Sequence, residues 1–251
     1  MASEPATVIG SYVSPYVRKV LVFLDLKGVQ YQVDPIVPFF GSEEFTRISP
    51  VRRIPVLIDG NVTLSDSTVI CEYLEDRYPN PPLYPTSPED RGRARWLEEF
   101  ANTRMGEVFI WKLFNEVIIR RFVWGEETDE ALVRNTLETE IPKILDYLES
   151  ELHPDGASFF DGIGIADIAV AAFFRNAAFA GFEVNPQRWP LTADFVARTL
   201  DHESFRRLRQ FEELSLKTPI SKHRDALTAV GAPVSPSTLG TSTPQRGVFR
   251  I

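Results

Sequence analysis

The stretch between residues 52 and 74 limits most strongly what this chain can fold into. An apolar run at 54–58 leads into Asp59-Gly60, a dipeptide typical of a two-residue hairpin turn, and a second short strand follows at 62–64. Residues 65–67 (Ser-Asp-Ser) are helix-capping types, and apolar residues at helical spacing come after them. The stretch therefore predicts a strand, a tight turn, a second strand and a helix.

Pro55 is the unusual residue of this stretch. Proline has no N–H, so it fits a paired strand only if that edge is open or the bond before it is cis. A cis Ile54–Pro55 bond would turn the main chain of Ile54 outward, where an extended peptide can pair with it. The capped helix start at 65–67 would lie beside that edge, and its free N–H groups favour a carboxylate. We therefore expect a site for a small, charged, extended peptide.

The preceding segment has the pattern strand, helix, strand. Residues 7–11 form an apolar run, residues 17–26 carry an amphipathic helical pattern that ends at Gly28, and residues 31–33 alternate as a strand. Two strands joined through a helix should run parallel. A connector with one helical turn at 43–48 then leads to the hairpin. The resulting order, β-α-β-(α)-β-β-α, is that of an α/β thioredoxin-like fold.

Ser14-Pro15 is the pair with the clearest chemical interest. Pro15 suits the first helical position, which makes Ser14 the N-cap. Ser14 either only caps this helix or points its hydroxyl at the thiol of a bound ligand. A free thiol has a pKa of about 8.5, and a hydroxyl donor at a helix N-terminus favours its thiolate form. Ser11 and Tyr12 are close enough in sequence to compete for this role.

Composition excludes several classes of protein. A formal net charge of -8 argues against nucleic acid or an anionic membrane as the main partner. The single cysteine, Cys71, excludes an internal disulfide and suits a buried position in a helix. The N-terminus does not resemble a signal peptide, and no apolar run reaches the roughly 20 residues of a membrane helix. These features lead us to expect a soluble cytoplasmic protein. The three histidines have no metal-ligand spacing, so we expect no metal site.

The chain after the proline-rich segment at 78–85 shows helical patterns only, until a tail rich in Pro, Ser and Thr. The tail is either a disordered or loosely docked extension, or a segment that covers part of a site or wraps a partner subunit, with apolar residues available at 247–251. The predicted organisation is a thioredoxin-like domain, a linker, an all-helical substrate domain and a C-terminal extension, at residues 1–83, 84–90, 91–228 and 229–251.

Four motifs carry a resemblance to a known family. They lie at residues 14–20, 26–31, 53–57 and 65–74, and they resemble the glutathione-binding domain of soluble glutathione transferases of the serine type, including bacterial and tau-like members. The motifs stand in the order and at the spacing of that family. The resemblance extends over residues 7–217 and is much sharper in the first third of the chain.

The resemblance implies a role for particular residues. Ser14 matches the hydroxyl that activates glutathione, and the main chain of Ile54 would pair with its cysteinyl part. Asp66 would pair with the γ-glutamyl ammonium, and the hydroxyl and N–H of Ser67 would take the α-carboxylate. The implied glutathione-binding residues are Ile54, Pro55, Asp66, Ser67, Arg53 and Phe39. The implied substrate-binding residues are Tyr12, Tyr16, Met105, Phe109 and Lys112.

The expected activity is transfer of the glutathione thiolate to a small hydrophobic electrophile, in detoxification and by a homodimer. Peroxide or disulfide reduction and ether cleavage are alternatives that use the same thiolate. Because Ser14 stands where some relatives have cysteine, chemistry through a protein mixed disulfide is not expected. A non-catalytic, partner-binding relative of the family is the alternative from another class. One departure from the family lies at Gly164, where the family usually has a Ser or Thr N-cap opposite the acid at Asp167.

Overall fold

The computed structural model describes residues 5–153 and 158–245. The chain forms two compact units, one made of Met1–Pro81 together with Glu203–Ile251, and the other of Pro82–His202. The first unit contains the sheet, and the second is helical. Residues 203–228, which the sequence patterns assign to the helical domain, therefore belong to the unit that contains the sheet. Among the described residues, no helix is long and apolar enough to cross a membrane.

A four-stranded sheet forms the centre of the first unit, in the order β2-β1-β3-β4. β1 and β2 pair in parallel, and β3 pairs antiparallel with both β1 and β4. These pairings confirm the predicted thioredoxin-like arrangement. Asp59 pairs with Val62, so the hairpin turn is centred on Gly60-Asn61, one residue later than predicted. The strands are β1 (Ala6–Ile9), β2 (Tyr31–Asp34), β3 (Val56–Asp59) and β4 (Val62–Ser65).

The helices of this unit begin and end at local signals in the sequence. The Ser14 hydroxyl accepts a hydrogen bond from the Val17 amide as the N-cap of α1, and Gly28 takes the left-handed conformation just beyond the end of α1. Asp66 caps α3 in the same way. The helices of the first unit are α1 (Pro15–Leu26), η1 (Pro38–Phe40), α2 (Glu43–Ile48), α3 (Ser67–Arg77), α9 (Glu203–Lys217), η4 (Ile220–Lys222) and α10 (His223–Ala229).

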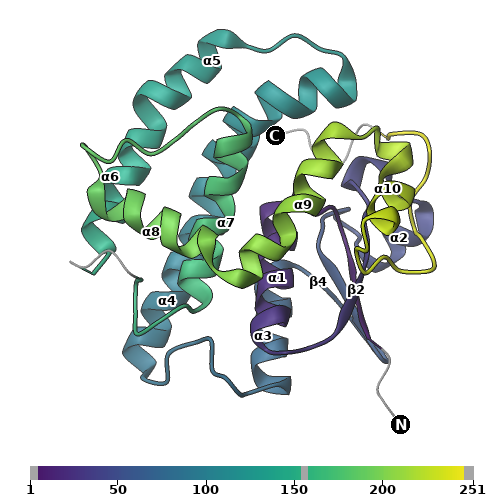
Figure 1. Ribbon diagram of the computed structural model, residues 1–251, viewed down its shortest axis with the longest axis horizontal. Helices are drawn as coiled ribbons and strands as arrows, with labels where there is room; N and C mark the ends of the chain where they lie inside the picture. The colour runs from purple at the N-terminus through teal and green to yellow at the C-terminus, as the bar shows by residue number, and fades with distance from the viewer. Residues whose placement is uncertain (1–4, 154–157, 246–251) are drawn as a thin grey trace. The chain divides into compact units, whose positions relative to one another are not determined.

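α9 packs beside α1 in the first unit (Figure 1). Two side-chain contacts explain this packing. Arg18 on α1 is fully buried, and its guanidinium donates to the carboxylate of Glu212 on α9. A buried charge needs such a partner, because an unpaired one is costly to remove from water. The ring of Tyr12 packs against Phe211, with centroids 5.2 Å apart. Helical spacing in the sequence predicts the buried face of α9, but not the surface that covers it.

The second unit is built around α7, whose side chains are almost all buried. The helical patterns of this part of the chain begin as α4, which continues without a break into η2, and η2 has wider, π-type turns. Pro142 lies in the first turn of α6, where proline is well tolerated. The elements of this unit are α4 (Pro88–Phe100), η2 (Ala101–Trp124), α5 (Glu130–Asn135), η3 (Thr136–Glu140), α6 (Ile141–Glu151), α7 (Ile165–Phe179) and α8 (Pro190–Asp201).

The start of α7 explains the missing hydroxyl at Gly164. The Leu83 carbonyl accepts the Ile165 amide at 2.8 Å, and a Cβ on residue 164 would lie only 2.9 Å from that carbonyl oxygen. Any larger residue would have to push this carbonyl away. Asp167 supplies the other half of the cap, since its Oδ2 accepts the Gly164 amide at 2.9 Å.

Candidate functional site

The register of the sheet brings four chain segments to one of its ends. Ile9 lies between Asp34 and Val56, and Val56 in turn pairs with Ser65, so these residues form one row across the sheet. The chain leaves β1, β2 and β4 at this row and enters β3 there. The segments that follow or precede the row carry Ser14, Phe39, Ile54–Pro55 and Asp66–Ser67. Residues far apart in the sequence are thus brought to the same end of the sheet.

The Ile54–Pro55 peptide bond is cis, as Pro55 suggested from the sequence. β3 begins at Val56, so Ile54 and Pro55 lie outside the paired strand. The main-chain N–H and C=O of Ile54 have no hydrogen-bond partner among the residues that the structure describes. Its side chain is buried, which leaves the main chain as the part of Ile54 that can pair with an extended ligand.

Ser14 is the best placed of the three candidate hydroxyls. Its side chain is half-buried, and its oxygen accepts the Val17 amide at a long 3.4 Å, which leaves the hydroxyl proton for another acceptor. The Ser11 hydroxyl is buried and accepts the Val13 amide at 3.3 Å. Tyr12 is 1% exposed, and burial raises the pKa of its phenol. The Tyr12 hydroxyl has no hydrogen-bond partner among the described residues.

Asp66 and Ser67 form the start of α3. Asp66 is exposed and takes a positive φ of 90°, a conformation that Asp tolerates better than most residues. Its Oδ1 accepts the Thr68 amide at 2.8 Å and the Val69 amide at 3.3 Å. These bonds leave Oδ2 for a cation. The buried Ser67 is the first residue of the helix, where main-chain N–H groups lack partners within the helix.

The two adjacent arginines have different surroundings. Arg53 is exposed, and its main chain is held by Ser49, whose hydroxyl contacts both the Arg53 amide at 3.0 Å and the Arg53 carbonyl at 2.8 Å. Arg52 is 6% exposed and donates to the Gly41 carbonyl at 2.8 Å and to Thr46. Arg52 therefore holds the connector before α2 and is not a solvated charge. The sequence contains no signal for the roles of Arg52 and Ser49.

The predicted substrate contacts fall into two groups. Tyr16 on α1 and Phe39 in η1 are half-buried. Met105 and Phe109 on η2 are fully buried, and Phe109 packs against Phe174 of α7 with ring centroids 5.3 Å apart. These last two side chains are part of the core of the helical unit and present no surface to a ligand. Helical spacing alone does not distinguish a core aromatic residue from one that lines a site.

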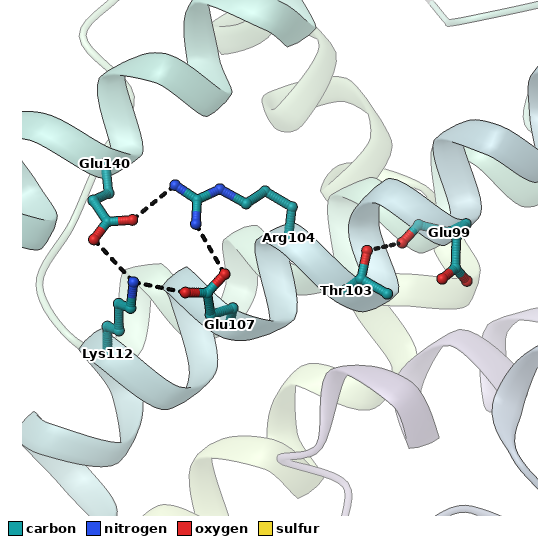
Figure 2. A network of polar contacts seen from close by, with 6 residues as sticks. All are labelled: Glu99, Thr103, Arg104, Glu107, Lys112 and Glu140. Carbon is teal, nitrogen blue, oxygen red and sulfur yellow. Dashed lines mark hydrogen bonds and ion pairs between the residues drawn. The ribbon is translucent and has the colours of Figure 1, made fainter. Parts of the chain in front are cut away.

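Lys112 belongs to a network of four charged residues in the helical unit (Figure 2). Its ammonium pairs with Glu107 at 2.7 Å and with Glu140 at 2.9 Å. Arg104 pairs with the same two carboxylates at 2.9 Å and 2.7 Å. The hydrogen bond from Lys112 lowers the pKa of Glu140, and both carboxylates raise that of Lys112. Lys112, which the resemblance implies as a substrate-binding residue, therefore has its positive charge balanced by neighbouring carboxylates.

The described residues contain no group of three or more His, Cys, Asp and Glu that could hold a metal ion. Cys71 is buried in α3 and forms no disulfide. The site at the sheet end is thus made of a hydroxyl at one helix start, an acid and a hydroxyl at another, and the open main chain before a cis-proline. This arrangement is that of a thioredoxin-like domain with two helix starts and an open main-chain segment at one end of its sheet.

Comparisons with known proteins agree with this class. Residues 8–82 match the family model of the glutathione S-transferase N-terminal domain. Glutathione S-transferase U17 of Arabidopsis thaliana is 30% identical over 182 residues, which are 69% of this chain and 74% of the relative. A glutathione S-transferase structure from Rhodospirillum rubrum matches with a TM-score of 0.75 at 25% identity and covers 81% of this chain and 91% of that one. The chain belongs to the glutathione S-transferase family.

Another match covers a smaller part of the chain. A stringent starvation protein A homolog of Haemophilus ducreyi is 41% identical over 80 residues, which are 32% of this chain and 37% of the relative. The chain thus matches little more than a third of the length of that protein.

Proposed function

We propose that this protein is a glutathione transferase that binds glutathione at the sheet end described above. The observation that carries the proposal is the row Asp34, Ile9, Val56 and Ser65, because it gathers the four segments that carry the candidate residues. Family membership supports the same ligand, since glutathione is the co-substrate of this family.

Each part of glutathione has a matching group in this proposal. The free Oδ2 of Asp66 pairs with the γ-glutamyl ammonium, and the α-carboxylate lies at the N-terminus of α3 beside Ser67. The cysteinyl main chain pairs with the open main chain of Ile54. Arg53 is exposed and near enough in sequence to receive the glycyl carboxylate. These contacts fix where the thiol lies, next to the loop that ends at Ser14.

The chemical step is nucleophilic attack by the glutathione sulfur. The thiol of glutathione releases its proton to solvent, and the Ser14 hydroxyl donates a hydrogen bond to the resulting thiolate. The partial positive charge at the start of α1 adds to this stabilisation. The sulfur forms a bond to the electron-poor carbon of a small hydrophobic electrophile, and the leaving group departs with its electron pair. Reduction of peroxides or disulfides and ether cleavage begin with the same thiolate and stay within the proposal.

The test is retention on immobilised glutathione, followed by turnover of a chloronitroaromatic, in which glutathione displaces chloride. Retention that free glutathione competes away, together with turnover that depends on added glutathione, supports the proposal. A panel of peroxides, disulfides and ethers then separates the three alternative reactions. Absence of binding to glutathione by the wild-type chain would refute the proposal.

A non-catalytic role in binding a protein partner is the second candidate. The observation that favours it is the match of about a third of the chain to stringent starvation protein A homologs, whose name records no transferase activity. Binding of glutathione without turnover on any member of the electrophile and peroxide panel would favour this candidate. A cytoplasmic location is proposed for either function.

A further inference from the structure

The C-terminal tail covers the open edge of the sheet. β2 is an edge strand, and its Val33 presents both main-chain groups away from β1. The Val33 amide donates to the Pro233 carbonyl at 2.7 Å, and the Val33 carbonyl accepts the Ser235 amide at 2.9 Å. Val33 and Val234 form a parallel bridge. Figure 1 shows the yellow tail beside β2 and α2. The described part of the tail is thus docked on the sheet by main-chain hydrogen bonds. The apolar residues expected to help docking, at 247–251, lie outside the described residues.

One ion pair fastens the tail to β2. Asp34 is 2% exposed, and its Oδ1 accepts Arg224 of α10 at 2.9 Å while its Oδ2 accepts the Leu239 amide at 2.7 Å. Arg224 also donates to the main-chain carbonyls of Ser235 at 2.6 Å and Ser237 at 3.1 Å. The pair therefore joins a strand, a helix and the tail. Hydrogen bonds to charged groups are among the stronger ones in proteins.

The tail also holds the connector that carries Phe39. The Gln245 amide donates to the Phe39 carbonyl at 2.7 Å, the Thr241 amide to the Phe40 carbonyl at 2.6 Å, and the Ser42 amide to the Leu239 carbonyl at 2.8 Å. Gly41 and Gly240 form an antiparallel bridge. Main-chain atoms of the tail thus contact four consecutive connector residues.

The opposite side of the connector is held by the body of the unit. The buried guanidinium of Arg52 donates to the carbonyls of Gly41 at 2.8 Å and Pro38 at 3.3 Å. A Cβ on Gly41 would lie 2.2 Å from the ring of Phe45, so the connector already lies against that ring. The connector is therefore enclosed between Arg52 and Phe45 on one side and the tail on the other.

We propose that the tail, residues 233–245, is a strap that positions the Phe39 connector for glutathione, with Asp34 and Arg224 as positioning residues. This inference rests on the proposed function and assigns the tail a part in its binding site. Ser14 follows β1, a different strand, so release of the strap leaves the activating hydroxyl in place. The strap therefore sets the affinity for glutathione and not the rate of the chemical step.

The experiment compares Arg224→Ala with wild type by calorimetric titration of glutathione, by steady-state kinetics with the chloronitroaromatic, and by amide hydrogen exchange. We expect faster exchange at Ser42 and Thr241, a Kd and a KM for glutathione raised roughly fivefold to thirtyfold, the factor that one or two lost charge-assisted hydrogen bonds supply, and an unchanged kcat. Arg224→Lys keeps the charge opposite Asp34 and should recover part of the affinity.

Arg198→Ala is the control, because it removes an arginine that pairs with an aspartate, Asp194, on the exposed surface of the helical unit, away from the tail; it should leave Kd unchanged. If Arg224→Ala does not fold, Asp34→Asn and Arg224→Lys serve instead, because each weakens the Asp34–Arg224 pair without removing a whole side chain. Faster exchange in the tail with an unchanged Kd overturns the strap, and so does a loss of kcat with an unchanged KM. A wild-type chain that binds no glutathione overturns the proposed function, and the strap with it.

Discussion

The hydroxyl of Ser49 holds both main-chain groups of Arg53. It accepts the Arg53 amide at 3.0 Å, lies 2.8 Å from the Arg53 carbonyl as a donor, and is 3.4 Å from the hydroxyl of Ser65. Ser49 is fully buried. One side chain thus fixes the residue before Ile54 and reaches the residue before Asp66, so it connects the two segments proposed to bind the cysteinyl and γ-glutamyl parts of glutathione.

Ser49→Ala should lower both stability and affinity for glutathione. The Arg53 N–H and C=O lose two partly buried hydrogen bonds, which together cost on the order of 1–3 kcal/mol in the free energy of unfolding. We expect a Kd for glutathione raised severalfold, measured by calorimetry. Ser215→Ala is the control, because it removes another buried hydroxyl of the same unit, one that donates to the Phe211 carbonyl. Equal effects of the two variants on Kd would show that Ser49 acts on stability alone.

Ser14→Ala should reduce turnover by roughly one to two orders of magnitude, the effect of losing one hydrogen bond aimed at an anion. The pKa of the bound glutathione thiol, measured by ultraviolet titration of the thiolate, should rise while the Kd for glutathione stays nearly constant. Ser14→Cys should shift activity from transfer toward mixed-disulfide chemistry.

The Ser14 variant also loses a helix cap, worth roughly 1 kcal/mol. Ser87→Ala provides a matched control, because Ser87 also precedes a proline and caps α4 by accepting the Asp90 amide at 3.0 Å. It should lose similar stability and keep full turnover. If Ser14→Ala leaves the thiol pKa and the turnover unchanged, Ser14 is only a helix cap. Ser11 or Tyr12 would then be the candidate for the activating hydroxyl.

Asp66→Asn should raise the KM for glutathione far more than it changes kcat, because the ammonium that Asp66 pairs with is present in both the ground state and the transition state. Asparagine keeps the cap on α3 and tolerates the positive φ, so the variant removes the charge alone. A glutathione analogue without the γ-glutamyl amino group should bind wild type and variant equally. Asp129→Asn, at the cap of α5, is the control. A variant that binds glutathione as wild type does contradicts the assignment.

Asp167 should make stability fall as the pH rises toward 6. Burial raises the pKa of its carboxyl to about 6, although the amides of Phe159 and Gly164 donate to it and act in the opposite direction. Between its unfolded pKa of about 4 and its folded value, the folded state binds more protons, so the free energy of unfolding decreases with pH over this range, by on the order of 2 kcal/mol.

Other groups also contribute to the pH dependence of stability, and burial lowers the pKa of His223. The measurement is therefore the difference in free energy of unfolding between wild type and Asp167→Asn, by urea titration from pH 4 to pH 8. The variant is less stable at every pH because Asn can accept only one of the two amides in place. A difference that stays constant across this range refutes the raised pKa.

We also expect a homodimer, the common assembly of this family. The mass of one chain is 28.4 kDa. Analytical ultracentrifugation at micromolar concentration should give a species of twice that mass. A species at the mass of a single chain refutes the expectation.

The sequence alone determined the parts of this protein that depend on local interactions. The caps at Ser14 and Asp66, the left-handed Gly28 and the cis bond before Pro55 follow from hydrogen bonds and torsion preferences within a few residues. These local signals predict the strand and helix order of residues 6–77, and with it the thioredoxin-like fold. They also single out Ser14, the main chain of Ile54 and the helix start at 65–67, whereas the remaining site residues come from the resemblance to the family.

Only the tertiary structure decided which residues are partners across long stretches of chain. An amphipathic pattern states that one face of a helix is buried but not what covers it, so the packing of α9 on Arg18 and the burial of Phe109 could not be read from spacing. The same holds for charges: the pairing of Asp34 with Arg224 and of Lys112 with Glu140 depends on where the backbone brings them. Such contacts join residues that no local interaction links, and they decide here which side chains support the fold and which remain free to meet a ligand.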